Sequence, residues 1–176
     1  MNEAGPQTVK QALAGHLARL WRYGLVLSRR SDVAEDLVQS TCVRAIERAH
    51  QFEPGTRIDR WLFSILHSIW LNEVRARRVR TGAGVVDAEQ ELTVDGASLL
   101  DQAILAQQVL RETMALPEAQ RETVFLVYVE GMTYREAAAV LDVPIGTVMS
   151  RLATARSALA RLNAATETRM PSGRQG

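Results

Sequence analysis

The stretch TYREAAAVLDVPIGTVMSRLATARSAL, residues 133–159, predicts two short helices that meet at a corner. Thr133 and Glu136 have the T-x-x-E spacing of a capping box, in which each side chain accepts a hydrogen bond from the other residue's backbone N–H. Pro144 cannot continue a helix but suits the turn before a new one. Together these signals are typical of a helix-turn-helix.

The second of these helices has one apolar and one small, polar side. Its buried side is predicted from apolar residues at helical spacing: Val148, Leu152, Ala155 and Leu159. The opposite side carries Gly146, Ser150, Ala153, Thr154, Ser157 and Arg161. Small side chains let a helix enter a major groove, and Arg135, Arg151 and Arg156 lie where they can reach phosphates. DNA binding is favoured, with an ordinary helical hairpin and a solvated face as the alternative.

Apolar residues recur at helical spacing along most of the chain, which predicts an all-α fold without strands. A first helix is expected over residues 9–29, with an apolar side formed by Leu13, Leu17, Leu20 and Trp21. A second helix is expected to begin at Asp32, which can cap it while Glu35 reaches back. The apolar side of this helix is predicted to contain Val38, Cys42, Ala45 and Ala49.

A third helix is expected after the break at Pro54 and Gly55, with Asp59 as its cap. Its apolar stripe is predicted to contain Leu62, Ile65, Leu66, Ile69 and Val74. Further along, a helix with Ile104 and Leu110 is expected. Pro117 is predicted in the first turn of another helix, which Gly131 can end.

The stretch between these two groups of helices is rich in glycine and acidic residues and shows little periodicity. It predicts a flexible linker, and so two small helical domains. The expected boundaries are a first domain at 1–80, a linker at 81–97, a second domain at 98–165 and a flexible tail at 166–176.

Composition excludes several classes of function. No apolar run approaches the ~20 residues that cross a bilayer, and no secretion signal is present, so a cytoplasmic protein without membrane insertion is expected. The single cysteine, Cys42, and three scattered histidines give no metal site and no internal disulfide. No cofactor, metal or catalytic residue is predicted.

Arginine dominates the positive charge, because Lys10 is the only lysine among 21 basic residues. Arg75, Arg77, Arg78 and Arg80 form a cluster just before the acidic stretch. Arginine suits planar, two-pronged contacts with phosphate and guanine, although codon composition explains the bias equally well.

Two blocks of sequence resemble bacterial sigma factors of the extracytoplasmic-function (ECF) group, in the sigma-70 family. They are AEDLVQSTCVRAIERAHQFEPGTRIDRWLFSILHSIWLNEVRARR, residues 34–78, and LPEAQRETVFLVYVEGMTYREAAAVLDVPIGTVMSRLATARSAL, residues 116–159. The resemblance covers roughly residues 17–162, with the blocks in the order typical of the family. It implies an N-terminal helical domain called region 2 and a C-terminal one called region 4.

The resemblance implies that the helix containing AEDLVQ docks on the clamp helices of the largest RNA polymerase subunit. The outward residues expected to make this contact are Asp36, Gln39, Ser40, Val43, Arg44 and Glu47. A valine among polar neighbours suits a protein interface. Ser40 departs from the acid found in many members, which could weaken or retune docking. Without the resemblance, the same residues would read as a solvated helix face.

The following segment is similar to the part of sigma factors that opens the promoter −10 element. The resemblance implies that a flipped base and the single strand are held by Arg57, Asp59, Arg60, Ser64, His67, Ser68, Asn72, Arg75, Arg77 and Arg78. Unstacking a base must be offset by a pocket and by basic groups that hold the strand. Trp61, Phe63 and Trp70 are interpreted mainly as core residues. His67, without an evident acid partner, is interpreted as a surface residue.

In region 4, the resemblance implies that the helix at residues 145–161 reads the −35 element. The residues expected at this surface are Arg135, Thr147, Met149, Ser150, Arg151, Ala153, Thr154 and Arg156. Many members have a basic residue where this chain has Met149 or Thr154, so apolar contacts, for example to thymine methyls, are expected to matter more.

The resulting prediction is an alternative-type sigma factor rather than an enzyme. Its expected partners are core RNA polymerase, through the clamp helices and the flap, promoter DNA, and an anti-sigma factor that holds it in check. The alternatives are a sigma-mimicking regulator that binds an anti-sigma factor, and a stand-alone helix-turn-helix regulator. An enzyme would need a positioned nucleophile or metal, which the acids of the linker do not supply.

Overall fold

Helices form all the regular structure in residues 4–81 and 111–169, which are the residues that the computed structural model describes. This confirms the predicted all-α fold. The predicted linker at 81–97 and the helix carrying Ile104 and Leu110 lie outside the described residues, except for Thr81. Within the described ranges no single helix is long and apolar enough to span a membrane, and only the bent pair Tyr134–Leu141 and Ile145–Arg161 passes that test jointly.

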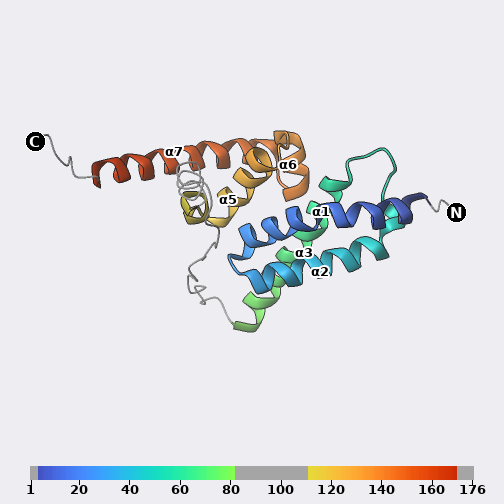
Figure 1. Ribbon diagram of the computed structural model, residues 1–176. Coiled ribbons are helices and arrows are strands. Elements are labelled where there is room, and N and C mark those ends of the chain that lie inside the picture. The colour runs from blue at the N-terminus through green and yellow to red at the C-terminus, as the bar shows by residue number, and fades with distance from the viewer. Residues whose placement is uncertain (1–3, 82–110, 170–176) are drawn as a thin grey trace, which may run out of the picture.

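The N-terminal half is a bundle of three helices: α1 (Ala4–Ser28), α2 (Ser31–Glu47) and α3 (Ile58–Thr81), with a 3₁₀ turn at Ala49–Gln51. Helices α1 and α2 pack along each other and both contact α3 (Figure 1). Gly24 allows the close approach of α1 to α2, because a Cβ atom at this position would lie 3.1 Å from Ala34 Cα. The turn between the two helices passes through Arg29, whose φ is +57°.

The buried side of α1 differs from the prediction. Leu13 and Leu20 are buried as expected, and Tyr23 and Leu27 join them in the core. Leu17 is 42% exposed, however, and Trp21 is only half-buried. Because seven residues make about two helical turns, Leu13, Leu20 and Leu27 share a side that Leu17 does not.

The predicted caps of the second and third helices are wrong. Helix α2 begins at Ser31, and Arg30 is its N-cap without a side-chain hydrogen bond. Asp32 lies in the first turn, where the Arg30 guanidinium binds its carboxylate. Helix α3 begins at Ile58, so Asp59 also lies in the first turn. Both acids therefore stabilise the positive end of a helix from inside it.

The apolar stripes of these two helices were predicted with different success. In α2 the fully buried residues are Ala34, Leu37, Thr41 and Ala45, whereas Val38 and Cys42 are only partly buried. In α3 the stripe is confirmed, with Leu62, Ile65, Leu66 and Ile69 buried and Val74 packed at the edge of the core.

The C-terminal half contains a helical stretch at residues 111–115, α5 (Glu118–Val124), a π-helical continuation at Phe125–Val129, α6 (Tyr134–Leu141) and α7 (Ile145–Arg169). Pro117 is the N-cap of α5 rather than its first residue. Gly131 ends the helix with φ +67°, as predicted for a glycine in that place. Helix α7 continues through Arg169, into the segment predicted as a tail from residue 166.

The two halves share one continuous core. Helix α5 packs on α1 and α6 packs on α3, while α7 contacts α5 and α6 on the side away from α3 (Figure 1). The ring of Tyr23 in α1 stacks on Phe125 at 5.6 Å between centroids and meets Phe63 of α3 edge-on. Nothing in the local sequence pattern predicted this packing.

Candidate polymerase- and nucleic-acid-binding surfaces

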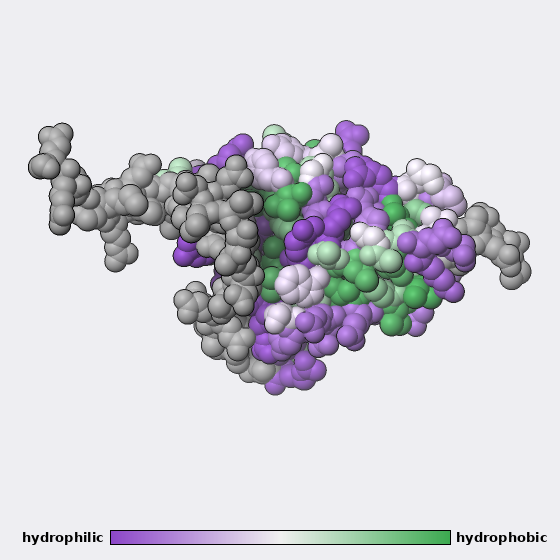
Figure 2. All heavy atoms as spheres, in the orientation of Figure 1, coloured by the Kyte–Doolittle hydropathy of each residue, from purple (hydrophilic) through white to green (hydrophobic). Residues whose placement is uncertain are grey.

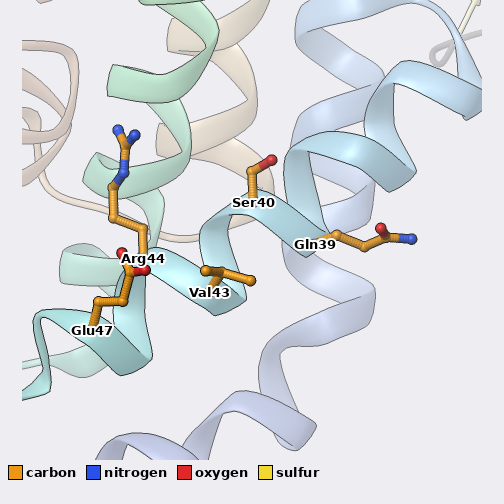
Figure 3. A pocket seen from close by; sticks show the side chains of 5 residues that line it. All are labelled: Gln39, Ser40, Val43, Arg44 and Glu47. Carbon is orange, nitrogen blue, oxygen red and sulfur yellow. The ribbon is translucent and has the colours of Figure 1, made fainter.

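The predicted docking residues form one continuous outer face of α2, here called the docking face. Five of them are exposed and Arg44 is half-buried: Asp36, Gln39, Ser40, Val43, Arg44 and Glu47. Five of the six line a shallow, open depression, which Figure 3 shows from close by. Val43 is 57% exposed, and Ile46, which was not among the predicted docking residues, is 45% exposed.

A second shallow groove adjoins the docking face between α1 and α2. Its lining is mostly apolar and contains Leu17, Trp21 and Val38, and Gln39 belongs to both hollows. Figure 2 shows apolar side chains gathered on the side of the molecule where α1 and α2 lie. The exposure of Leu17 thus extends the apolar surface of α2 onto α1.

The residues predicted to contact the −10 element lie just before and along α3. Several of them already form ion pairs with other residues of this chain. The Asp59 carboxylate lies 2.6 Å from the Arg57 guanidinium and 3.4 Å from that of Arg19. Partial burial raises the pKa of Asp59, but hydrogen bonds from Arg57, from the Arg60 amide and from Arg19 outweigh it and lower this pKa to about 2. Asp59 is therefore charged and serves to hold the Arg57 side chain.

Two of the predicted strand contacts pair with acids of the C-terminal half. Arg60 forms an ion pair with Glu136 of α6. His67 is buried, and its Nε2 lies 3.3 Å from a carboxylate oxygen of Glu122 in α5. The interpretation of His67 as a surface residue without an acid partner is therefore wrong, because packing brings Glu122 to it from 55 positions away in the sequence.

The remaining residues of this group lie further along α3. Ser64 is half-buried, whereas Ser68, Asn72, Arg75 and Arg78 are exposed. Arg77 packs over the Trp70 ring at 5.6 Å and pairs with Glu73. The exposed members thus form a polar and basic strip that runs from the middle of α3 towards its C-terminal end, here called the α3 strip.

The three aromatic residues of this segment serve the core, as predicted. Phe63 and Trp70 are buried, and Trp61 packs on Phe52 with 5.4 Å between ring centroids. The Trp70 Nε1–H donates a hydrogen bond of 2.6 Å to Glu118 of α5. These contacts leave Phe63 and Trp70 unable to stack on a base in this arrangement.

The helix-turn-helix has the geometry that the sequence predicts. Thr133 Oγ1 accepts a hydrogen bond from the Glu136 N–H, and the Glu136 carboxylate accepts one from the Thr133 N–H. Helices α6 and α7 meet at 104°, within the range of about 90–120° for this motif. Asp142, whose φ is +53°, makes the left-handed C-cap of α6, which was not predicted from the sequence.

The outer face of α7, here called the recognition face, is exposed as predicted. Its side chains are Met149, Ser150, Ala153, Thr154 and Arg156, with Thr147 half-buried and Arg135 exposed on α6. The Ser150 and Thr154 hydroxyls donate to backbone carbonyls of their own helix. Arg151 differs, because Glu122 binds its guanidinium at 3.0 Å and fixes it to α5.

A set of charged residues between the two halves was not predicted from the sequence. Glu130 pairs with Arg19 at 2.6 Å. Arg121 is buried, which lowers its pKa to about 10, and donates hydrogen bonds to backbone carbonyls at the end of α1. The signal that could have indicated this role is the pair Arg121–Glu122, which directly precedes a strongly apolar run.

Comparison with known proteins covers both halves. Residues 13–80 match the family described as Sigma-70 region 2, and residues 106–159 match Sigma-70, region 4. The chain is 36% identical over 142 residues to the ECF RNA polymerase sigma factor EcfG of Rhodopseudomonas palustris, covering 80% of this chain and 76% of that one. The chain belongs to the ECF sigma factors of the sigma-70 family.

Two further similarities agree with this assignment. The ECF RNA polymerase sigma factor SigE of Mycolicibacterium smegmatis is 32% identical over 147 residues, which are 82% of this chain and 57% of that protein. The sigma factor RpoE of Bartonella quintana, solved in complex with the anti-sigma factor NepR, is 32% identical with a TM-score of 0.74. That match covers 88% of this sigma factor and 96% of RpoE. The docking face and the α3 strip thus belong to region 2, and the recognition face to region 4.

Proposed function

We propose that this sigma factor joins core RNA polymerase through the docking face and directs initiation at promoters whose −10 and −35 elements its two regions read. The observation that carries the proposal is the occurrence of three exposed surfaces of suitable chemistry in one chain. These are a partly apolar helix face, a basic strip and a small, polar recognition helix.

The docking face suits a protein partner. Val43 and Ile46 are large apolar side chains that remain exposed among polar neighbours, and burying them against a partner is favourable. The clamp helices of the largest polymerase subunit are the proposed partner for this face. The polymerase flap is the proposed partner of region 4.

The recognition face suits a major groove. Its small side chains allow the axis of α7 to approach the bases closely, and Met149 can contact a thymine methyl. Arg135 and Arg156 lie exposed at its flanks, where phosphates would pass. The exposed α3 strip, with Ser68, Asn72 and Arg75, is proposed to hold the single strand at the −10 element.

An anti-sigma factor is the proposed regulator, and the support is the solved complex of the similar RpoE with the anti-sigma factor NepR. We place the protein in the cytoplasm, where core polymerase and promoters are found. The activity is that of a specificity subunit, without a chemical step of its own.

The experiment that tests the function is run-off transcription with purified core polymerase over a library of promoters from the source genome. Transcripts restricted to a few promoters, and absent without the protein, are expected. Tight binding to core polymerase without any transcript would favour a sigma-mimicking regulator. Failure to bind core polymerase would overturn the proposal.

A further inference from the structure

We propose that Glu122 is a positioning residue for reading of the −35 element: it binds Arg151, and through Arg151 it fixes the rotation of α7 about its own axis. Arg151 then joins two helices of region 4 and does not contact a phosphate. This inference rests on the proposed function, because it concerns how the recognition face of the same protein is directed at DNA.

The contact joins α5 to the second turn of α7. Glu122 Oε1 accepts a hydrogen bond of 3.0 Å from Arg151 Nη1. The Glu122 side chain is 8% exposed and that of Arg151 is 23% exposed, so salt and water screen this pair less than a surface ion pair. The second carboxylate oxygen of Glu122 faces His67 Nε2 at 3.3 Å. Both oxygens of Glu122 are therefore engaged, and Arg151 meets a carboxylate that has little freedom to move.

Apolar packing alone leaves the rotation of α7 weakly defined. The buried residues of this helix are Val148, Leu152 and Ala155, and they pack within region 4. Apolar packing of this kind is not directional, whereas a hydrogen bond requires a nearly linear arrangement of donor, hydrogen and acceptor. The bond from Arg151 to Glu122 therefore adds a directional restraint at the edge of the apolar contact.

Arg151 lies next to the recognition face. It directly follows Ser150, and Thr154 is its neighbour one turn later on the surface of α7. Because successive residues point about 100° apart around a helix, even a modest rotation of α7 would turn Ser150 and Thr154 away from the base edges. Base readout needs groups at hydrogen-bonding distance, so such a rotation reduces discrimination among bases more than it reduces overall attraction to DNA.

Arg151 also differs from the two other arginines predicted to reach phosphates. Arg135 and Arg156 are exposed, whereas Arg151 is half-buried and bound to a carboxylate. A phosphate would have to displace Glu122, and removing one partner from a largely buried ion pair leaves a charge that is costly to keep. The loss of Arg151 should therefore leave the number of phosphates that the protein neutralises unchanged.

Four variants of the full chain separate positioning from phosphate binding. Glu122→Gln and Arg151→Gln each break the ion pair, and the double variant completes a double-mutant cycle. Arg156→Gln removes an exposed arginine at the flank of the recognition face. Glu53→Gln is the matched control for the loss of a carboxylate, since Glu53 is exposed in the N-terminal half and belongs to none of the three proposed surfaces. Circular dichroism establishes that each variant is folded.

Each protein is used to select duplexes from a pool with a randomised −35 element, once alone and once with core polymerase. Affinity for the preferred duplex is then measured at several salt concentrations. Glu122→Gln and Arg151→Gln should each bind that duplex about tenfold more weakly and select a less defined sequence, with the slope of affinity against salt unchanged. The double variant should be no worse than either single variant. Arg156→Gln should keep the selected sequence but reduce the slope by about one.

Several results would overturn the inference. A reduced salt slope in Arg151→Gln would make Arg151 a phosphate contact. Unchanged or tighter binding by Glu122→Gln would mean that this carboxylate does not aim the helix. Losses that add up in the double variant would show that the two residues act separately. If one single variant does not fold, the sequence selected by the other decides the matter.

The two arms of the selection separate this inference from the proposed function. Promoter-specific run-off transcription with the same −35 selectivity in wild type and variants would mean that the function holds and the positioning role does not. Sequence selection by the chain alone that weakens in Glu122→Gln and Arg151→Gln, without transcription from any promoter, would support the positioning role and contradict the function.

Discussion

The carboxylate of Glu136 caps α6 and also binds Arg60 at the start of α3. One oxygen accepts the Thr133 N–H at 2.8 Å, and the other pairs with the Arg60 guanidinium. The backbone hydrogen bond of Thr133 is the main cause that lowers the pKa of Glu136, and the positive charges of Arg60 and Arg57 add to it. The Glu136 carboxylate therefore caps the first helix of the helix-turn-helix and also forms an ion pair between region 4 and region 2.

Replacing Val43 with aspartate should weaken binding to core polymerase by roughly tenfold, because a charge would replace the apolar centre of the docking face. The fold should be unaffected, since Val43 is 57% exposed. Affinity for core polymerase, measured by fluorescence anisotropy, checks the result. Val79→Asp is the matched control, because Val79 is 85% exposed on α3, away from that face. Equal loss in both variants would count against the docking face.

Ser150→Glu should abolish promoter-specific transcription, because the new carboxylate would lie against bases and phosphates in the groove. Binding to core polymerase should stay at the wild-type level, since Ser150 is exposed on α7 and distant from α2 in the sequence. The control is Ser31→Glu, an exposed serine in the first turn of α2, where an acid is favourable. Wild-type promoter use by Ser150→Glu would remove α7 from the groove.

The Asp59 carboxylate should make folding sensitive to acid. Its pKa is lowered to about 2 in the folded chain, from a model-peptide value of 3.8, so its contribution is fully present above the unfolded value. That contribution, about 2 kcal/mol, is lost as the pH falls from about 4 to about 2. Urea unfolding of the wild type and of Asp59→Asn between about pH 2 and pH 6 checks this, because the two stabilities should converge at the acid end. A constant difference across that range would contradict it.

Thr133→Ala should lower the free energy of unfolding by about 1 kcal/mol, because the Glu136 N–H loses its cap acceptor. Chemical denaturation monitored by circular dichroism measures the change. Thr154→Ala provides the comparison, since its hydroxyl is exposed and bonds only to the carbonyl one turn back in α7. A similar loss in both proteins would mean that the cap contributes nothing specific.

Several features were predictable from the sequence because they depend on neighbours along the chain. The capping box of Thr133 and Glu136 lies within four residues, and Pro144 and Gly131 act through their own backbone. In α7 the spacing of the apolar residues was enough to predict which side faces outward, so the exposure of Ser150 and Thr154 was predicted correctly. The burial of Leu17 was predicted wrongly, because the spacing of apolar residues within one helix does not determine which of them a neighbouring helix will cover.

What the sequence alone determined is the order of the helices, the corner between α6 and α7, and the membership of two blocks in the sigma-70 family. The tertiary structure alone decided that Glu122 reaches His67 and that Glu130, 111 positions after Arg19, binds it. Local propensity acts over a few residues, whereas these pairs depend on how whole helices pack and on which charges are then desolvated together. For that reason the exposed sides of α2 and α7 could be predicted from the sequence, but the contacts of Arg60 and His67 with the C-terminal half could not.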